Sequence, residues 1–188
     1  GALVVDEIYH GLVYDAPVRT ALHDGDDIFV VNSFSKYYGM TGWRLGWLVV
    51  PEVYLEDITR LCQNLFISAP TVAQHAALEA FAPATLAELE RRRDEFRRRR
   101  DFLLPALRGL GFGVPVDPDG AFYVYADVAA FTDDAEALAA RLLEQAEVAI
   151  TPGRDFGSHQ AATHVRFSYA NRLENLELAV ARLDAALR

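Results

Sequence analysis

The stretch Ser33-Phe34-Ser35-Lys36-Tyr37-Tyr38-Gly39-Met40-Thr41-Gly42-Trp43-Arg44-Leu45-Gly46-Trp47 contains the only lysine of the chain. The chain has 18 lysine and arginine residues, and all of them except Lys36 are arginine. Arginine keeps its proton at any workable pH, whereas a lysine with a lowered pKa can act as an amine nucleophile and form Schiff bases with carbonyl compounds. Chance placement would explain one lysine equally well, so the neighbouring residues must decide what Lys36 does.

The composition is that of a globular protein. The chain has 188 residues, 52% of them hydrophobic, which is enough to bury a sizeable core. Its formal net charge of −9 argues against broad nucleic-acid binding. A single cysteine excludes an internal disulfide framework, and neither a membrane span nor a signal peptide is recognisable. We therefore expect a cytoplasmic protein without nucleic-acid or membrane partners.

The first part of the chain alternates predicted strands and helices. Apolar, β-branched runs at residues 3–5, 28–31 and 47–50 predict strands buried on both faces, as in a parallel sheet covered by helices. Pro51 and Pro70 predict the starts of two helices, which we expect to run through Leu61 and Phe81. Because the chain opens on such a strand without an initiator methionine, we expect it to begin partway through a larger fold.

The character of the sequence changes at residue 84. Spaced leucines predict a long helix that ends near Gly109, with arginines at 91–93 and 97–100. Acidic residues interleave these arginines, which favours a solvated helix face over a nucleic-acid patch. An α+β pattern follows. We expect strands at 121–127, 148–150 and 164–169 and helices at 134–145 and 173–187.

Two polar residues follow the first predicted strand, at the kind of strand end where open α/β sheets bind ligands. The Asp6 carboxylate could keep a pyridine nitrogen protonated, which would make that ring a stronger electron sink. Tyr9 could donate a hydrogen bond to the phenolate oxygen of the same ring. Each residue has a plainer interpretation, since Asp6 could cap a helix and Tyr9 could be a core aromatic residue.

Four further residues suit a phosphorylated aldehyde cofactor. Ser33 and Arg44 could bind the phosphate, and Arg166 could grip a substrate carboxylate through its fork of N–H groups. Lys36 could carry the cofactor as an imine and then move a proton at the substrate α-carbon. Alternatively, Ser33 could cap a turn, Arg44 could form an ion pair and Arg166 could be a strand-edge cation. Their occurrence together, around a single lysine, favours the cofactor interpretation.

These motifs resemble those of a known family. Ser33-x-Ser35-Lys36 followed by Gly42-Trp43-Arg44-Leu45-Gly46 resembles the pyridoxal-phosphate attachment segment of class I/II aminotransferases, which have fold type I. The form Met40-Thr41-Gly42-Trp43-Arg44 is most similar to the prokaryotic aspartate and aromatic aminotransferase branch. Asp6-Glu7-Ile8-Tyr9, Gly120-Ala121-Phe122-Tyr123, Pro152-Gly153 with Phe156-Gly157, and Val165-Arg166-Phe167-Ser168-Tyr169-Ala170 also match family segments, so the resemblance covers nearly all 188 residues.

The resemblance implies an α/β fold, namely the C-terminal half of a fold type I pyridoxal-phosphate-dependent transferase. Residues 1–83 would be the C-terminal part of the cofactor-binding large domain, a remnant of its mainly parallel sheet with helices. Residues 84–188 would be the connecting helix and a small C-terminal α+β domain. The implied cofactor is pyridoxal 5′-phosphate. The implied catalytic residue is Lys36, which also holds the cofactor. The other implied cofactor ligands are Asp6, Tyr9, Ser33 and Arg44. The implied ligand of the substrate carboxylate is Arg166.

The implied activity is transfer of an amino group from an amino acid to a 2-oxo acid through a Lys36 Schiff base. Family members are homodimers with active sites at the subunit interface. Their glycine-containing phosphate loop, stacking aromatic residue and phenolate-binding asparagine have no counterpart in this chain, so we expect a fragment whose activity belongs to the intact protein. A carbon–sulfur β-lyase and an aminotransferase-like sensory domain of a transcriptional regulator stay open as alternatives. The histidine spacing indicates no metal site, and the sequence does not select one amino acid.

Overall fold

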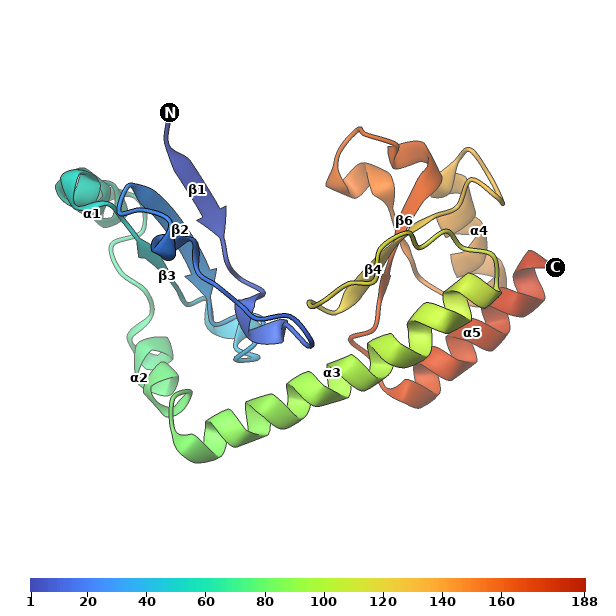
Figure 1. Ribbon diagram of the computed structural model, residues 1–188, viewed down its shortest axis with the longest axis horizontal. Coiled ribbons are helices and arrows are strands. Elements are labelled where there is room, and N and C mark those ends of the chain that lie inside the picture. Colours follow the sequence, from blue (N-terminus) through green and yellow to red (C-terminus); the bar gives the residue numbers. More distant parts are fainter. The chain divides into compact units, whose positions relative to one another are not determined.

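The computed structural model describes residues 1–188 and divides into two compact units, Gly1–Arg93 and Asp94–Arg188. Each unit contains its own three-stranded sheet, and strands of both sheets are labelled in Figure 1. None of the helices combines the length and the apolar character that a membrane crossing requires.

The sheet of the first unit has the strand order β1-β2-β3, formed by β1 (Leu3–Asp6), β2 (Ile28–Ser33) and β3 (Gly46–Val49). β1 and β2 are parallel, with Asp6 opposite Val31, whereas β3 runs antiparallel to β2, with Gly46 opposite Ser33. The carboxyl ends of β1 and β2 therefore share one edge of the sheet with the start of β3.

Burial in this sheet differs from the prediction. Ile28 and Val30 of β2 are buried, but Leu3 and Val4 of β1 are 55% and 61% exposed. Consecutive strand residues point to opposite faces, so β1 is exposed on both. Most of β3 is also exposed. The expectation that all three runs are buried on both faces is thus wrong for β1 and β3, because burial needs a packed layer on each face and the helices of this unit do not cover these side chains.

Two helices follow the sheet, each preceded by a proline as predicted. Pro51 precedes a 3-10 turn, Glu52–Tyr54, which continues into α1 (Leu55–Leu65). Pro70 precedes α2 (Thr71–Glu79). The first helix thus runs one turn past the predicted end at residue 61, and the second ends two residues before the predicted end at residue 81. Proline suits these entries because its fixed φ fits a helix start and its missing N–H costs nothing there.

The long helix α3 spans Pro83–Gly109, and the boundary between the two units falls within it. Most of its arginines pair with carboxylates one turn away, as the interleaved charges predicted. Glu88 accepts hydrogen bonds from Arg91 and Arg92 at 2.7 and 2.8 Å, within the same helix face. Such pairs each stabilise a helix by about 0.2–0.5 kcal/mol. These contacts confirm a charge-paired, solvated helix face, except at Arg100, which is buried and pairs with the adjacent Asp101 at 2.7 Å.

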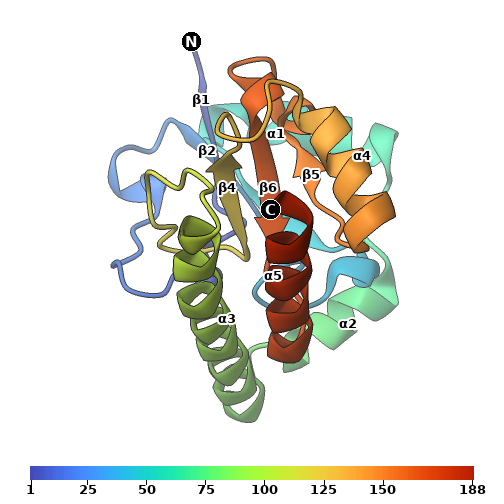
Figure 2. The same ribbon diagram turned by 90° about the vertical axis from the view of Figure 1, so that its right-hand side faces the viewer.

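The second unit contains an antiparallel sheet of order β4-β6-β5 with helices packed against it (Figure 2). Its elements are β4 (Tyr123–Asp127), α4 (Ala135–Ala146), β5 (Thr151–Pro152), β6 (His164–Ser168) and α5 (Leu173–Leu187). Asp134 caps α4 by accepting hydrogen bonds from two backbone N–H groups. Leu107, Leu142 and Tyr169 are fully buried in the core of this unit.

Two predicted strands of this unit have different limits. β4 begins at Tyr123 rather than at residue 121, because Ala121 adopts a left-handed conformation with φ of 62° that a strand does not allow. The prediction of a strand at 148–150 is wrong. Val148 is buried but not paired, and the ladder with β6 begins only at Thr151.

Candidate active site

Five of the six residues predicted for the site belong to the first unit and lie at or just beyond one edge of its sheet. Asp6 and Ser33 are the last residues of β1 and β2. Arg44 lies two residues before the first residue of β3, which is paired with Ser33. The topology therefore places the carboxylate, the hydroxyl and the guanidinium at neighbouring strand ends, with Tyr9 and Lys36 in the loops that leave this edge.

Lys36 sits in a loop that is anchored on both sides. Phe34 and Met40 are buried and pack in one cluster with Ala77 and Ala80 of the α2 region. The backbone N–H of Met40 donates to the Phe34 carbonyl at 2.9 Å, which closes the loop around Lys36. The Lys36 Nζ lies 6.0 Å from the centroid of the Tyr9 ring. The loop thus holds the amine beside the predicted ring-oxygen ligand.

Ser33 and Ser35 form a small hydroxyl cluster before the lysine. Their Oγ atoms are 2.9 Å apart, and the Ser33 Oγ accepts the backbone N–H of Ser35 at 3.0 Å. Ser33 therefore caps a turn, as one of its two interpretations had it. A turn-capping hydroxyl can also bind an anion, so the two roles are compatible.

Arg44 has an unusual backbone conformation. Its φ of 54° and ψ of 51° are left-handed, which costs a residue other than glycine roughly 1–2 kcal/mol. Its Nη1 donates to the Thr41 carbonyl at 2.8 Å, and the side chain is exposed and forms no ion pair. The ion-pair alternative is thus wrong. Strained backbone conformations of this kind cluster at active sites and ligand-binding sites.

Asp6 and Tyr9 occupy the turn after β1. The Asp6 Oδ1 accepts the backbone N–H of Ile8 at 3.0 Å, so the carboxylate shapes this turn rather than capping a helix. Tyr9 is half-buried and immediately precedes a 3-10 turn, His10–Leu12. The Asp6 side chain is exposed.

Arg166 belongs to the second unit and lies on β6, the central strand of its sheet. This position excludes the strand-edge alternative. The guanidinium carbon lies 4.8 Å from the Phe156 ring centroid and 5.5 Å from that of Tyr123, and Nη2 donates to the Thr151 hydroxyl at 3.4 Å. Its Nε is buried without a hydrogen-bond partner. A buried, unpaired N–H of a cation is costly, so this group fits an acceptor that the protein itself does not supply.

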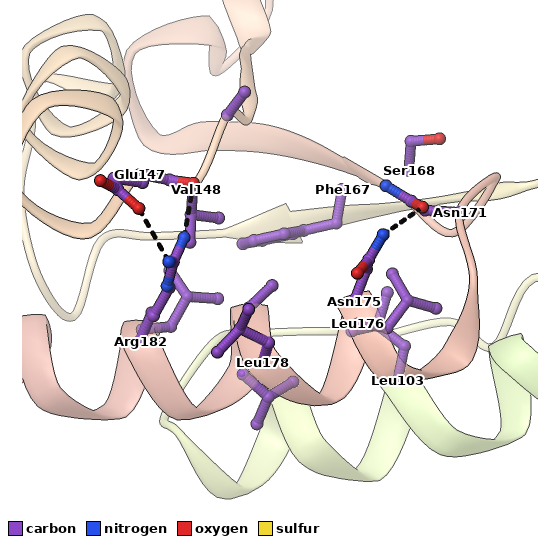
Figure 3. Close-up of a pocket in the computed structure, with 14 residues that line it drawn as sticks. Leu103, Glu147, Val148, Phe167, Ser168, Asn171, Asn175, Leu176, Leu178 and Arg182 are labelled. Carbon is purple, nitrogen blue, oxygen red and sulfur yellow. Dashed lines mark hydrogen bonds and ion pairs between the residues drawn. The ribbon is translucent and has the colours of Figure 1, made fainter.

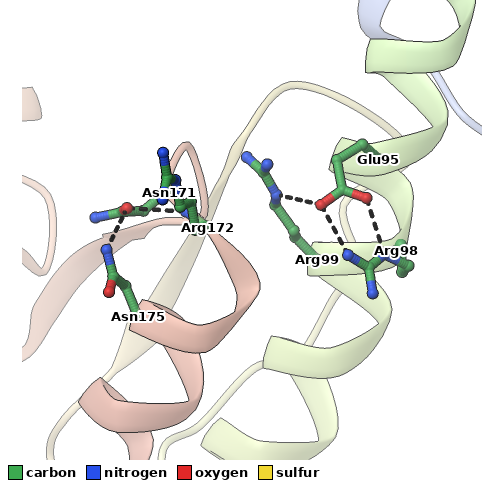
Figure 4. Close-up of polar contacts among 6 residues, drawn as sticks. All are labelled: Glu95, Arg98, Arg99, Asn171, Arg172 and Asn175. Carbon is green, nitrogen blue, oxygen red and sulfur yellow. Dashed lines mark hydrogen bonds and ion pairs between the residues drawn. The ribbon is translucent and has the colours of Figure 1, made fainter.

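A cavity of about 400 Å³ lies elsewhere in the second unit, between α5 and the end of β6 (Figure 3). None of the six predicted residues lines it. Arg182 closes one end through an ion pair with Glu147 at 2.7 Å. The Asn171 Oδ1 accepts from the Arg172 N–H and from the Asn175 side chain (Figure 4). Since none of these polar groups belongs to the predicted set, the cavity is separate from the candidate site.

Sequence reasoning missed three residues that shape the site. The Glu7 carboxylate is buried and accepts hydrogen bonds from the Thr20 hydroxyl and the Ala21 N–H, which fixes the loop between β1 and β2. The Tyr37 hydroxyl donates to the Glu90 carboxylate on α3. Only the position of Glu7 beside Asp6 was a usable signal, because nothing in the spacing links residues 37 and 90.

The class of protein follows from comparison with known families. The model of the family described as aminotransferase class I and II matches residues 1–183, so the chain belongs to this family. Members of the family depend on pyridoxal 5′-phosphate. The match confirms the family and the fold type expected from the lysine segment.

Particular relatives are similar over almost the whole chain. The valine–pyruvate aminotransferase of Mycobacterium tuberculosis is 43% identical over 98% of this chain and 48% of its own length. The aspartate/prephenate aminotransferase of Thermus thermophilus is 40% identical over 98% of this chain and 48% of its own length. A crystal structure of an aminotransferase from Mycobacterium tuberculosis superimposes with a TM-score of 0.95, at 43% identity, over 99% of this chain and 49% of that one. The chain spans about half the length of the curated relatives it matches.

Proposed function

We propose that the intact protein containing this chain is a pyridoxal-phosphate-dependent aminotransferase that moves an amino group from an amino acid to a 2-oxo acid. The observation that carries the proposal is the anchored Lys36 loop, which holds the only lysine beside Tyr9 at the ligand-binding edge of the sheet. Relatives named as valine–pyruvate and aspartate/prephenate aminotransferases support transamination over a lyase reaction or a sensory role.

The residues of the chain fit the cofactor. Phosphate needs hydrogen-bond donors and positive charge, and the Ser33 hydroxyl and the exposed Arg44 guanidinium supply both. An aldehyde needs an amine nucleophile, which only Lys36 offers among the side chains of this chain. The exposed Asp6 carboxylate at the end of β1 suits a protonated pyridine nitrogen. The set therefore contains one group for each functional part of the cofactor, with Tyr9 for the ring oxygen.

Each residue then has a defined task. When bound, the cofactor supplies an electron sink that stabilises negative charge at the substrate α-carbon. Lys36 holds the cofactor covalently and moves a proton at that carbon. Asp6 and Tyr9 orient the ring, and Ser33 and Arg44 hold the phosphate. Arg166 binds the α-carboxylate of the substrate with the guanidinium whose Nε lacks a partner in the protein.

The wider assignments are also proposals. Residues 1–83 would belong to the cofactor-binding large domain and residues 84–188 to the connecting helix and the small domain. The intact protein would be a cytoplasmic homodimer. Large exposed apolar side chains on α1 support an interface there, since Leu61 and Leu65 are 53% and 77% exposed and isolated proteins rarely leave such patches uncovered.

The test uses the intact protein with an amino acid alone. A transaminase converts its bound cofactor to the pyridoxamine form, whose absorbance differs, and stops after one half-reaction. A β-lyase instead releases pyruvate and ammonia without accumulating that form. We expect the half-reaction in the wild type and its loss in both K36A and K36R, because the arginine keeps the charge but not the nucleophile. A K36A protein that transaminates at the wild-type rate would refute the proposal.

A further inference from the structure

Tyr37, which directly follows Lys36, is held from two sides by parts of the first unit that are distant in sequence. On one side its ring packs against the backbone of Gly11. A Cβ atom on Gly11 would lie only 2.6 Å from the Tyr37 Cδ2 and closer still to its Cγ. The Tyr37 ring can therefore approach the backbone this closely only because residue 11 has no side chain, and any residue larger than glycine would displace the ring.

Gly11 belongs to the turn after β1 that carries Tyr9. The backbone N–H of Leu12 donates to the Tyr9 carbonyl at 2.8 Å, so Tyr9 and Gly11 lie in one hydrogen-bonded turn. The ring of Tyr37 thus sets the separation between the Lys36 loop and the Tyr9 turn. This agrees with the position of the Lys36 Nζ, 6.0 Å from the centroid of the Tyr9 ring.

On the other side, the Tyr37 hydroxyl donates to the Glu90 Oε1 on α3, and the other oxygen of Glu90 pairs with Arg93. Burial, followed by the hydrogen bond to Glu90, raises the pKa of the Tyr37 phenol above its usual range. The phenol therefore stays a neutral donor at any functional pH. This hydrogen bond restrains the Tyr37 side chain in one orientation.

We propose that Tyr37 is a positioning residue for Lys36. It fixes the position of the Lys36 loop relative to the Tyr9 turn through its contact with Gly11, and relative to α3 through its hydrogen bond to Glu90. The inference rests on the proposed function, since it presumes that the Lys36 amine attacks the cofactor. Tyr37 itself would touch neither cofactor nor substrate. Its effect would be to hold the amine in attacking geometry, and small misplacements of a reacting group can slow a reaction about a hundredfold.

The test follows the covalent capture of the cofactor by the intact protein rather than its activity. Cofactor-free protein is mixed with pyridoxal 5′-phosphate, samples are reduced with borohydride at intervals, and the labelled fraction of the Lys36 peptide is measured by mass spectrometry. We expect Y37F and E90A each to slow labelling about tenfold, because both remove the same hydrogen bond and release the loop. E90Q keeps an acceptor oxygen and should label close to the wild-type rate.

Y38F is the matched control. The ring of the neighbouring Tyr38 packs against that of Phe34 in a tilted arrangement, with centroids 4.8 Å apart, and the Y38F protein should label like the wild type. Circular dichroism verifies folding, and if Y37F does not fold, E90A carries the test. A folded Y37F or E90A protein that labels at the wild-type rate overturns the positioning role, as does equal slowing in Y38F. The proposed function fails separately, if the wild type itself takes no label at Lys36.

Discussion

Ser33 and Gly46 face each other across β2 and β3, at the strand ends from which the Lys36 loop departs and to which it returns. A Cβ atom on Gly46 would lie 2.7 Å from the Asn32 carbonyl oxygen and 3.4 Å from the Ser33 Cα. The loop can close between these strands only because residue 46 has no side chain. The geometry of the serine hydroxyl and of Arg44 thus depends on a glycine.

Gly46→Ala is therefore expected to destabilise the intact protein. The new Cβ atom would meet the backbone carbonyl oxygen of Asn32, which cannot rotate away as a side chain could. The resulting overpacking should lower the free energy of unfolding by about 1–3 kcal/mol. Gly42→Ala is the matched control, because a Cβ there meets nothing within 4 Å. The measurement is the urea midpoint of each variant. Equal midpoints for the two variants would contradict the close approach of β2 and β3.

Arg44→Lys tests the phosphate role of the strained arginine. Lysine keeps the charge but loses the paired N–H groups, so we expect cofactor affinity to fall about tenfold, the equivalent of about 1.4 kcal/mol. Arg19→Lys is the control, since Arg19 is an exposed arginine paired with Asp24. Affinity is read by titrating the cofactor-free intact protein. Unchanged affinity in Arg44→Lys would remove Arg44 from the site.

Arg166→Lys should change substrate binding and leave cofactor binding alone. The lysine ammonium cannot make two parallel hydrogen bonds to a carboxylate as a guanidinium does, so the KM for the amino acid should rise at least tenfold. Arg154→Lys, at an exposed arginine that pairs with Glu136, is the matched control. Steady-state kinetics give the KM, and cofactor titration gives the affinity. A rise in cofactor Kd with an unchanged KM would contradict the assignment.

The stability of the fold is expected to depend on pH through an ion-paired carboxylate of α3. Hydrogen bonds from Arg91 and then from Arg92 lower the pKa of Glu88 from its usual 4.5 to about 2. A lowered pKa in the folded state means that the charged form stabilises the fold above pH 4.5, and that this contribution disappears as the pH falls towards 2. The difference in urea midpoint between wild type and Glu88→Gln should therefore be constant near neutrality and shrink below pH 4.5.

Glu52→Gln serves as its control, because Glu52 is a surface carboxylate without an ion pair. A difference between wild type and Glu88→Gln that grows as the pH falls would contradict the pairing of Glu88 with its two arginines.

Much of the fold could be predicted because local signals determine it. Prolines at 51 and 70 and the leucine spacing of α3 gave the helices within about one turn. What failed depends on packing partners that a local pattern does not contain. The exposure of Leu3 and Val4 and the absence of pairing at Val148 are set by neighbouring layers and strands, not by hydrophobicity.

The candidate site divides in the same way. Lys36, Ser33 and Arg44 lie in one short motif, so their grouping could be predicted, although their chemical roles stay predictions. Tyr37 with Glu90 could not be predicted, since the contact joins residues 53 positions apart and exists only after α3 packs beside the loop.

Lys36 is the proposed anchor of the cofactor, and borohydride reduction of the cofactor-loaded intact protein tests this role most directly. Reduction fixes the cofactor on whichever amine holds it, and peptide mass mapping then locates the label. We expect one labelled peptide, with the modification on Lys36, and no label in K36A. A label on any other residue, or a Lys36 peptide of unmodified mass from fully loaded protein, would contradict it.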